Sequence, residues 1–425
     1  MKKMSKIFIA AKKTICLIFI LFFSAIIALQ AQEKITLMKC IEQAKAYSKA
    51  LSIQSENKEQ AYQRLIEVKG GMMPSVFYRY QKAYQDNVNG TVPGEFTDSK
   101  FEVTQPIFKG FTKVNSFKAN RNELQRQEYL IATVNRQLLS AVANAFYTLG
   151  QHESDYKNLG ETITLLQQRV DELNERVRLG KSRESEVLVV QSEIASLKAQ
   201  AEQTKGDGAD SLESLSYLTG IDSSKLIISD DTQDIEQAVP IDKVLESALN
   251  RSEMRALLEQ IKEQNFRLAI AKGDFLPTLD LDANYYTVRS NETYANAKWD
   301  AAFSLNLPLF QGGSSLAKAR EQQSLLRQLE DQRVDLQRSI RKEVQSFYRQ
   351  LVSAIDQVRA LKDAYDKANQ SYKLQVRDYR LGLVENIDVL QSLTSLLDAK
   401  TSLDRAKIRA KSLAALLEIS SETLS

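Results

Sequence analysis

The sequence predicts a mainly helical protein that also supplies part of a transmembrane β-barrel. Three features predict this fold class: a tandem duplication of a unit of about 200 residues, helices far longer than those of globular proteins, and four segments in which apolar and polar residues alternate. Each unit is expected to contain a helix, two strands joined by a polar loop, a very long helix and a return helix.

The duplication is visible as short motifs that recur in the same order in both halves of the 425-residue chain. Arg-Leu-Gly ends at Gly180 and again at Gly382, which are 202 residues apart. Pro-x-Phe-x-Gly begins at Pro106 and at Pro308, with the same separation. Two further matches keep nearly this separation. Chance similarity between helices could produce one such match but not four in order, so the chain contains two copies of one unit.

The two copies define the expected domain organisation. The first repeat is expected at residues 32–225 and the second at 241–425, with a linker at 226–240 between them. Each repeat is expected to carry one β-hairpin, at residues 75–109 in the first and at 278–310 in the second.

The first 31 residues are expected to be a secretory signal peptide. Five lysines between Lys2 and Lys13 precede the apolar run 14–29, and Ala31 provides a small residue at the expected cleavage point. An uncleaved membrane anchor is the alternative, but the run is short for a span of roughly 20 residues. The mature chain, from residue 32, is therefore expected to be exported and to have no transmembrane helix.

The alternating segments have the length and pattern of outer-membrane strands, about 10 residues each. In the second repeat, the apolar positions expected to face lipid are Leu279, Leu281, Phe303, Leu305 and Leu307. A soluble antiparallel sheet is the alternative, but its apolar face would have to pack on helices that already carry their own apolar stripe. Four strands cannot close a barrel, which needs about eight, and lipid leaves no strand edge unpaired. Several chains must therefore share one barrel, with eight strands from two copies or twelve from three.

The long helix of the second repeat is expected between Gly313 and Gly382, and its counterpart ends near Leu179. Neither Pro nor Gly interrupts the second of these, and apolar residues recur along it at spacings of three and four, which is typical of coiled-coil packing. Roughly 65 residues correspond to about 100 Å of helix. The first helix of each repeat is expected at 37–69 and at 241–273 and is about half as long.

The tips of the two helix hairpins are expected near Gly180 and Gly382. Both glycines follow a long helix directly, as glycines in the left-handed conformation do at helix C-termini. Ser182 and Asn386 are candidate N-caps for the two return helices, because short polar side chains are preferred at that position.

Composition argues against the other common function classes. The 57 basic and 54 acidic residues nearly balance, whereas a nucleic-acid surface needs a concentrated basic excess. His152 is the one histidine of the chain and is expected to be solvated in a helix, and Cys40 is the one cysteine of the mature chain and is expected to be buried. No phosphate-binding or dinucleotide motif occurs. The sequence therefore predicts a protein that is not an enzyme, with no catalytic, cofactor-binding or metal-binding residues.

With these features, nearly the whole mature chain resembles the TolC family of bacterial outer-membrane efflux proteins. The resemblance rests on the duplicated unit, on the two Pro-x-Phe-x-Gly motifs, and on the Leu-Gly turns that are followed by an acidic residue, Val and Leu. It implies a homotrimer with a twelve-stranded barrel in the outer membrane and an α-helical barrel across the periplasm. It also implies a passive exit duct for efflux or type I secretion, which works with a periplasmic membrane-fusion (adaptor) protein and an inner-membrane transporter.

The resemblance also assigns roles at the periplasmic tip. It implies that Tyr379 and Glu186 form a link that keeps the tip closed, whereas Val384 stands where the family pattern has an Arg and removes a second link. Two acidic rings narrow the family's entrance; Asp388 matches the first, and Gln391 departs from the second. The alternative for Asp388 is an ordinary first-turn acid at a helix N-terminus. The residues expected to dock the adaptor are Arg178, Leu179, Gly180, Arg380, Leu381 and Gly382.

An exported coiled-coil scaffold or adhesin without channel activity is the alternative function. It would share the long helices but would not need alternating strands in both repeats. The sequence identifies neither the transported substrate nor the class of pump. Gly206 and Gly208 are expected to interrupt the first return helix, with no functional role assigned.

Overall fold

The computed structural model describes residues 34–85, 94–289 and 297–423. The expected signal peptide, residues 1–31, lies outside them. The described chain forms two compact units, one built from parts of residues 1–48, 137–241 and 345–425, the other from 49–136 and 242–344. The helices α4 (Thr112–Arg178) and α8 (Ser314–Arg380) each contribute residues to both units.

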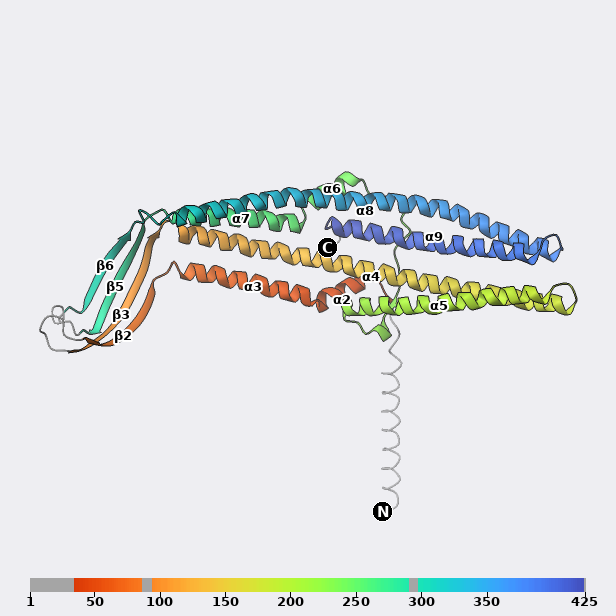
Figure 1. Ribbon diagram of the computed structural model, residues 1–425, viewed down its shortest axis with the longest axis horizontal. Helices are drawn as coiled ribbons and strands as arrows, with labels where there is room; N and C mark the ends of the chain where they lie inside the picture. Colours follow the sequence, from red (N-terminus) through yellow and green to blue (C-terminus); the bar gives the residue numbers. More distant parts are fainter. Residues whose placement is uncertain (1–33, 86–93, 290–296, 424–425) are drawn as a thin grey trace, which may run out of the picture. The chain divides into compact units, whose positions relative to one another are not determined.

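The second of these units contains a four-stranded antiparallel sheet, in the order β2-β3-β5-β6 (Figure 1). The bounds of the strands are Ser75–Gln85 for β2, Gly94–Lys109 for β3, Thr278–Val288 for β5 and Trp299–Asn306 for β6. Among the described strands, β2 and β6 each pair on one side only, so the sheet has two open edges.

The register places the predicted apolar positions opposite one another. Leu279 pairs with Leu305 and Leu281 pairs with Phe303, while Asp280, between them, pairs with Ser304. Directly opposed residues of antiparallel strands lie on the same face of a sheet. One face is therefore apolar along β5 and β6, and the period-two interpretation of these strands is confirmed.

The second hairpin is shorter than predicted. β6 ends at Asn306 rather than at residue 310, so Leu307 lies beyond the strand. Pro308 has no amide hydrogen to donate to a ladder, and β6 is an edge strand with one partner. The equivalent Pro106 is accommodated inside β3, which pairs on both sides and has an irregularity in its register between Pro106 and Phe108.

The turn from β3 into α4 lies against the backbone at the end of α7 (Ser252–Gly273). Gly110 has a φ of 56°, and a Cβ added there would come within 2.4 Å of the carbonyl oxygen of Gly273. The reverse holds as well: a Cβ on Gly273 would lie 2.5 Å from the oxygen of Gly110. This close approach explains the glycine of the first Pro-x-Phe-x-Gly motif, because an added side chain requires one backbone to move.

Gly110→Ala is therefore expected to destabilise the protein strongly, by about 3 kcal/mol or more, from the left-handed φ and the backbone overlap together. Gly312→Ala is the matched control, because Gly312 also has a positive φ, of 61°, but no atom lies within 4 Å of an added Cβ. Thermal unfolding of the detergent-purified protein measures both. Equal losses at the two glycines would show that the backbone contact is unimportant.

The helices of the unit with the sheet are α3 (Lys49–Gly70), α6 (Ile241–Leu249, from Asp242 on), α7 (Ser252–Gly273) and the first parts of α4 and α8, up to Arg136 and Val344. Both long helices have 67 residues, close to the predicted length. The other unit contains α2 (Leu37–Tyr47), α5 (Glu184–Thr219), α9 (Asn386–Ser420) and the remaining parts of α4 and α8, from Gln137 and Gln345 on.

Both of the shorter helices expected at the start of the repeats are in fact pairs. The helix expected at 37–69 is divided at Ser48 into α2 and α3, and Ser48 has an extended ψ of 113°. The helix expected at 241–273 is divided after Leu249 into α6 (Ile241–Leu249) and α7. Conversely, α5 is continuous through Gly206 and Gly208, so the predicted interruption is wrong. A glycine in a helix costs about 1 kcal/mol, and the buried Leu215 anchors the later part of α5 in the core.

The core of the helical unit collects residues from distant parts of the chain. Cys40 and Ile41 of α2, Phe146 of α4, Leu215 of α5 and Ile419 of α9 are among its buried members. Burial raises the pKa of the Cys40 thiol to about 11, so Cys40 is a packing residue, as predicted, and is unreactive at neutral pH. The predicted linker joins this unit through β4 (Ile227–Ile228), which pairs in parallel with β1 (Lys34–Ile35).

None of the described helices combines the length and apolar character needed to cross a membrane.

Candidate functional site

The two helix-hairpin tips have the same backbone geometry. Gly180 and Gly382 have φ values of 67° and 76°. At the first tip, the amide of Lys181 donates to the carbonyl of Arg176 over 2.8 Å, and the amide of Leu383 makes the equivalent bond at the second. These bonds define Schellman motifs, so the left-handed glycines are as predicted.

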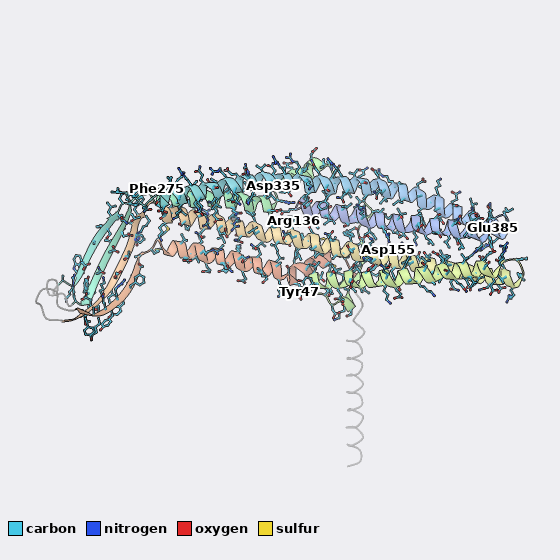
Figure 2. The ribbon with its side chains drawn as sticks, viewed as in Figure 1. Tyr47, Arg136, Asp155, Phe275, Asp335 and Glu385 are labelled. Carbon is cyan, nitrogen blue, oxygen red and sulfur yellow. The ribbon has the colours of Figure 1, made fainter. Side chains whose placement is uncertain are left out.

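The caps of the return helices differ from those predicted. The N-cap of α5 is Arg183, without a side-chain bond, and the N-cap of α9 is Glu385, labelled in Figure 2. Glu385 forms a capping box with Asp388, whose Oδ2 accepts from the amide of Glu385 over 2.9 Å. Such reciprocal bonds satisfy two helix amides at once. Asp388 therefore has the first-turn capping role that was its alternative interpretation.

Tyr379, near the end of α8, lies between two arginines of α4. The guanidinium carbons of Arg169 and Arg176 are 3.9 and 4.4 Å from the centre of the Tyr379 ring. The ring is 5 % exposed. Cation–π contacts of this kind are worth about 2 kcal/mol or more when the cation is desolvated, as Arg169 is.

Arg169 also connects α4 to the start of α9. Its Nε and Nη2 both donate to Oδ1 of Asn386, over 2.9 and 2.8 Å. Its Nη1 donates to Glu172 over 2.7 Å, and Glu172 in turn accepts from Arg380 of α8 over 3.2 Å. Asn386, predicted as an N-cap, is thus the first residue of α9 and the acceptor of a buried arginine.

The carboxylate of Glu172 stays ionised in this arrangement. Burial alone would raise its pKa, but hydrogen bonds and charge from Arg169 and Arg380 outweigh burial and lower the pKa below its ordinary value. We call Arg169, Glu172, Arg176, Tyr379, Arg380 and Asn386 the tip cluster. The tip cluster joins α4 of the first repeat to α8 and α9 of the second.

Further polar contacts join α4 to α9 beyond the tip cluster. Arg405 donates to Asp155 over 2.9 Å, and Asn158 donates to Asp404 over the same distance (Asp155 is labelled in Figure 2). Lys400 forms an ion pair with Glu161. These contacts continue the connection between the two repeats along α4.

The polar face of the sheet carries paired charges. Glu102 accepts from Arg79 and Lys100, and Lys100 also donates to Asn284 over 2.9 Å. On the same face, Lys109 pairs with Asp280 over 2.5 Å. The sheet therefore presents one apolar face and one face of compensated charge.

Similarity to known proteins agrees with this architecture. Residues 244–420 match the family described as outer membrane efflux protein. The outer membrane protein TolC of Salmonella enteritidis is 24 % identical over 405 residues, covering 87 % of this chain and 78 % of TolC. TolC of Escherichia coli K12 is 23 % identical over 407 residues, covering 87 % and 79 %. These similarities confirm the resemblance to the TolC family of outer-membrane efflux proteins.

Solved structures of this fold include the outer membrane protein VceC of Vibrio cholerae, with a TM-score of 0.80, 16 % identity and coverage of 91 % of this chain and 95 % of VceC. CusC gives a TM-score of 0.81 at 16 % identity, with 91 % of both chains covered. The family match and the TolC relatives together indicate an outer-membrane channel for efflux or secretion that extends into the periplasm. These matches give no support to an exported scaffold or adhesin. The relatives named here are outer-membrane proteins rather than enzymes.

In this efflux protein, the residues predicted as a gate are not all brought together. Among the described hydrogen bonds, none joins Tyr379 to Glu186, and Glu186 accepts instead from Ser182 over 2.9 Å. Val384 packs on the buried cluster that contains Tyr379. Gln391 lines a groove of about 1020 Å³ between α4, α5 and α9.

The residues predicted to dock an adaptor lie at exposed turns. Leu179 and Leu381 are 64 % and 67 % exposed, and the neighbouring Leu383, which was not predicted, is 70 % exposed. Arg178 pairs with Glu175 of its own helix.

Sequence reasoning missed Arg169, Glu172 and Arg176. Arg169 and Arg176 are seven residues apart and flank the apolar positions Val170 and Leu173. Arginines at heptad spacing beside an apolar stripe were the available signal for a buried cationic site.

Proposed function

We propose that three copies of this chain form a passive duct that carries substrates across the outer membrane and the periplasm. The observation that carries the proposal is the four-stranded sheet, which has one apolar face, one charged face and two open edges. Lipid tolerates no unpaired edge. Pairing β6 of one copy with β2 of the next removes every edge, and three copies give twelve strands.

The faces of the sheet then have separate roles. The apolar face, with Leu279, Leu281, Phe303 and Leu305, would meet lipid. The charged face would line the lumen, as in barrels whose interior is polar. Leu307 would lie at the lower boundary of the barrel, beyond the end of β6.

The two repeats, 32–225 and 241–425, would each supply one helix hairpin to a tube below the barrel, with the segment 226–240 between them. The tips with Arg178, Leu179 and Gly180 and with Arg380, Leu381 and Gly382 would dock a periplasmic adaptor protein. Exposed leucines beside arginines offer such a partner both apolar contact and charge. An inner-membrane transporter would supply energy and choose the substrate, and the duct itself would perform no chemistry.

The tip cluster would hold the duct closed at rest. It joins hairpins from both repeats, so the hairpins can separate only if its contacts break. The link between Tyr379 and Glu186 implied by the family pattern would be a second constraint.

Fractionation tests the assembly. The duct should be found in the outer membrane as a trimer that resists SDS without boiling. A soluble periplasmic monomer would overturn the proposal.

Asp388→Asn is expected to reduce the preference of the channel for cations several-fold. Three carboxylates around an axis favour cations, whereas an asparagine side chain can still accept the capping bond. Reversal potentials in planar bilayers under a salt gradient measure the preference. Gln391→Asn is the control and should leave it unchanged. An unaltered reversal potential for Asp388→Asn would show that Asp388 only caps α9 and does not contribute to cation preference.

A further inference from the structure

Two glutamates of the unit that contains the sheet are buried side by side. Glu123 of α4 and Glu263 of α7 are 7 % and 6 % exposed, and both carboxyl groups lie beside Nε of Arg126, which is 2.7 Å from Oε2 of Glu123 and 3.7 Å from Oε2 of Glu263. Neither belongs to the tip cluster or to the charged face of the sheet. A carboxyl–carboxyl hydrogen bond requires one proton, because two ionised carboxylates have no donor between them.

The hydrogen bonds locate this proton. Oε1 of Glu123 accepts from Gln127 over 2.6 Å, and its Oε2 accepts from Nε of Arg126 over 2.7 Å. Oε1 of Glu263 accepts from Nε of Arg267 over 2.7 Å. Oε2 of Glu263 lies 3.7 Å from Nε of Arg126, which is too long for a hydrogen bond. Among the described donors, none makes a hydrogen bond to this oxygen, so it is the oxygen of the pair that is free to carry a proton.

The surrounding charges come from three helices. Arg126 lies on α4 with Glu123, and Arg267 lies on α7 with Glu263. From α3, Arg64 approaches Oε1 of Glu123 at 3.8 Å. From α8, the uncharged Gln322 accepts from Gln264, the residue next to Glu263. Arg64 and Arg267 are each about half exposed, so water weakens their influence.

These surroundings shift the pKa values of the two glutamates in opposite directions. Burial, together with the neighbouring Glu123, raises the pKa of Glu263 above its ordinary value, although Arg267 opposes the rise. Burial also acts to raise the pKa of Glu123, but bonds from Gln127, Glu263 and Arg126 outweigh burial and lower it. Paired carboxyls at contact distance ordinarily share a proton in this way.

We propose that the proton held between Glu263 and Glu123 fastens α7 to α4, and that its loss on raising the pH loosens this contact. This contact between α4 and α7 lies close to the sheet along the chain. β3 continues into α4, α7 continues into β5, and β3 and β5 are the pair that joins the two hairpins of the sheet. The device is independent of the channel proposal, because it depends only on these two helices.

The direction of the pH effect follows from the raised pKa of Glu263. The contribution to stability is complete below the ordinary pKa of glutamate, about 4.3, and is lost as the pH rises through the higher pKa of the folded state. Between these two pKa values, each pH unit should shift the unfolding equilibrium of a chain by up to about tenfold toward unfolding, because the folded chain still holds a proton that the unfolded chain has released; above the folded-state pKa the shift levels off.

Infrared spectroscopy of the purified full-length protein tests the proton directly. A carbonyl-stretch band of a buried, protonated carboxylic acid should be present in the wild type at mildly acidic pH and disappear on alkalisation. Glu263→Gln should lack this component, and so should Glu123→Gln, because an amide donor at position 123 would let Glu263 ionise. Absence of the band in the wild type would overturn the proposal without any variant having to fold.

Thermal unfolding as a function of pH tests whether the proton stabilises the contact between α7 and α4. Glu263→Gln keeps a donor to Glu123, so its stability should depend less on pH than that of the wild type. The matched control is Glu259→Gln, one turn earlier on α7, where the glutamate pairs with Lys262; it should keep the wild-type pH profile. A wild-type profile for Glu263→Gln would contradict the proposal.

Discussion

Arg169→Met combined with Arg380→Met is expected to raise the resting ion conductance of the protein in planar bilayers by about tenfold or more. Hydrogen bonds to charged groups contribute about 1.5–3 kcal/mol each, and 1.4 kcal/mol changes an equilibrium tenfold. The variant removes the bonds from Arg169 to Asn386 and from Arg380 to Glu172, which connect the two repeats. Methionine still packs on the ring of Tyr379, so the helices should remain folded.

Arg178→Met is the control for the loss of an arginine at the tip. Arg178 is exposed and pairs within its own helix, so its replacement should leave the conductance unchanged. Tyr379→Phe with Glu186→Gln tests the family-derived link in the same measurement and should give a smaller rise, because Glu186 already bonds to Ser182. Unchanged conductance in the Arg169 and Arg380 variant would exclude the tip cluster as the closing element.

Phe303→Arg is expected to abolish assembly in the outer membrane. Phe303 lies opposite Leu281 on the apolar face, where an arginine at the bilayer midplane costs about 2–4 kcal/mol per chain. Three chains share one barrel in the proposed assembly, so the penalty is incurred three times. The amount of SDS-resistant trimer in outer-membrane fractions measures the effect.

Ala302→Arg is the matched control, because it places the same side chain one residue away on the opposite face. Ala302 pairs with Asp282 on the charged face, where an arginine would meet a carboxylate and the proposed lumen. It should assemble. Equal loss of trimer in both variants would show that the two faces of β6 do not differ in environment.

Features that depend on local sequence were predictable. Alternation in β5 and β6 determined which residues share a face, because slipping the register by one residue would reverse every side chain. The left-handed glycines at 180 and 382 followed from helix-ending chemistry. The N-caps were wrong at both tips, since the Glu385–Asp388 capping box places the cap one residue earlier than Asn386.

Features that depend on distant contacts were not predictable. Arg169 and Tyr379 are 210 residues apart in sequence, and nothing near either one indicates that their side chains meet. The division of the first helix at Ser48 has neither a proline nor a glycine to signal it. Gly206 and Gly208 gave the opposite error, because tertiary packing maintained a helix that local propensity disfavours.

Closure of the sheet between copies is the central claim, and inter-chain disulfide formation tests it most directly. Phe77 of β2 and Ala302 of β6 lie on the charged face at the two open edges. Cysteines at both positions should, on oxidation in outer membranes, link chains into a covalent species of three. The buried Cys40, with its raised pKa, should not compete. A second variant carries its cysteines at Phe77 and Ser304, because the register between β6 of one copy and β2 of the next decides which residues lie opposite each other. Cross-links confined to single chains, or none in either pair, would contradict a barrel shared by three copies.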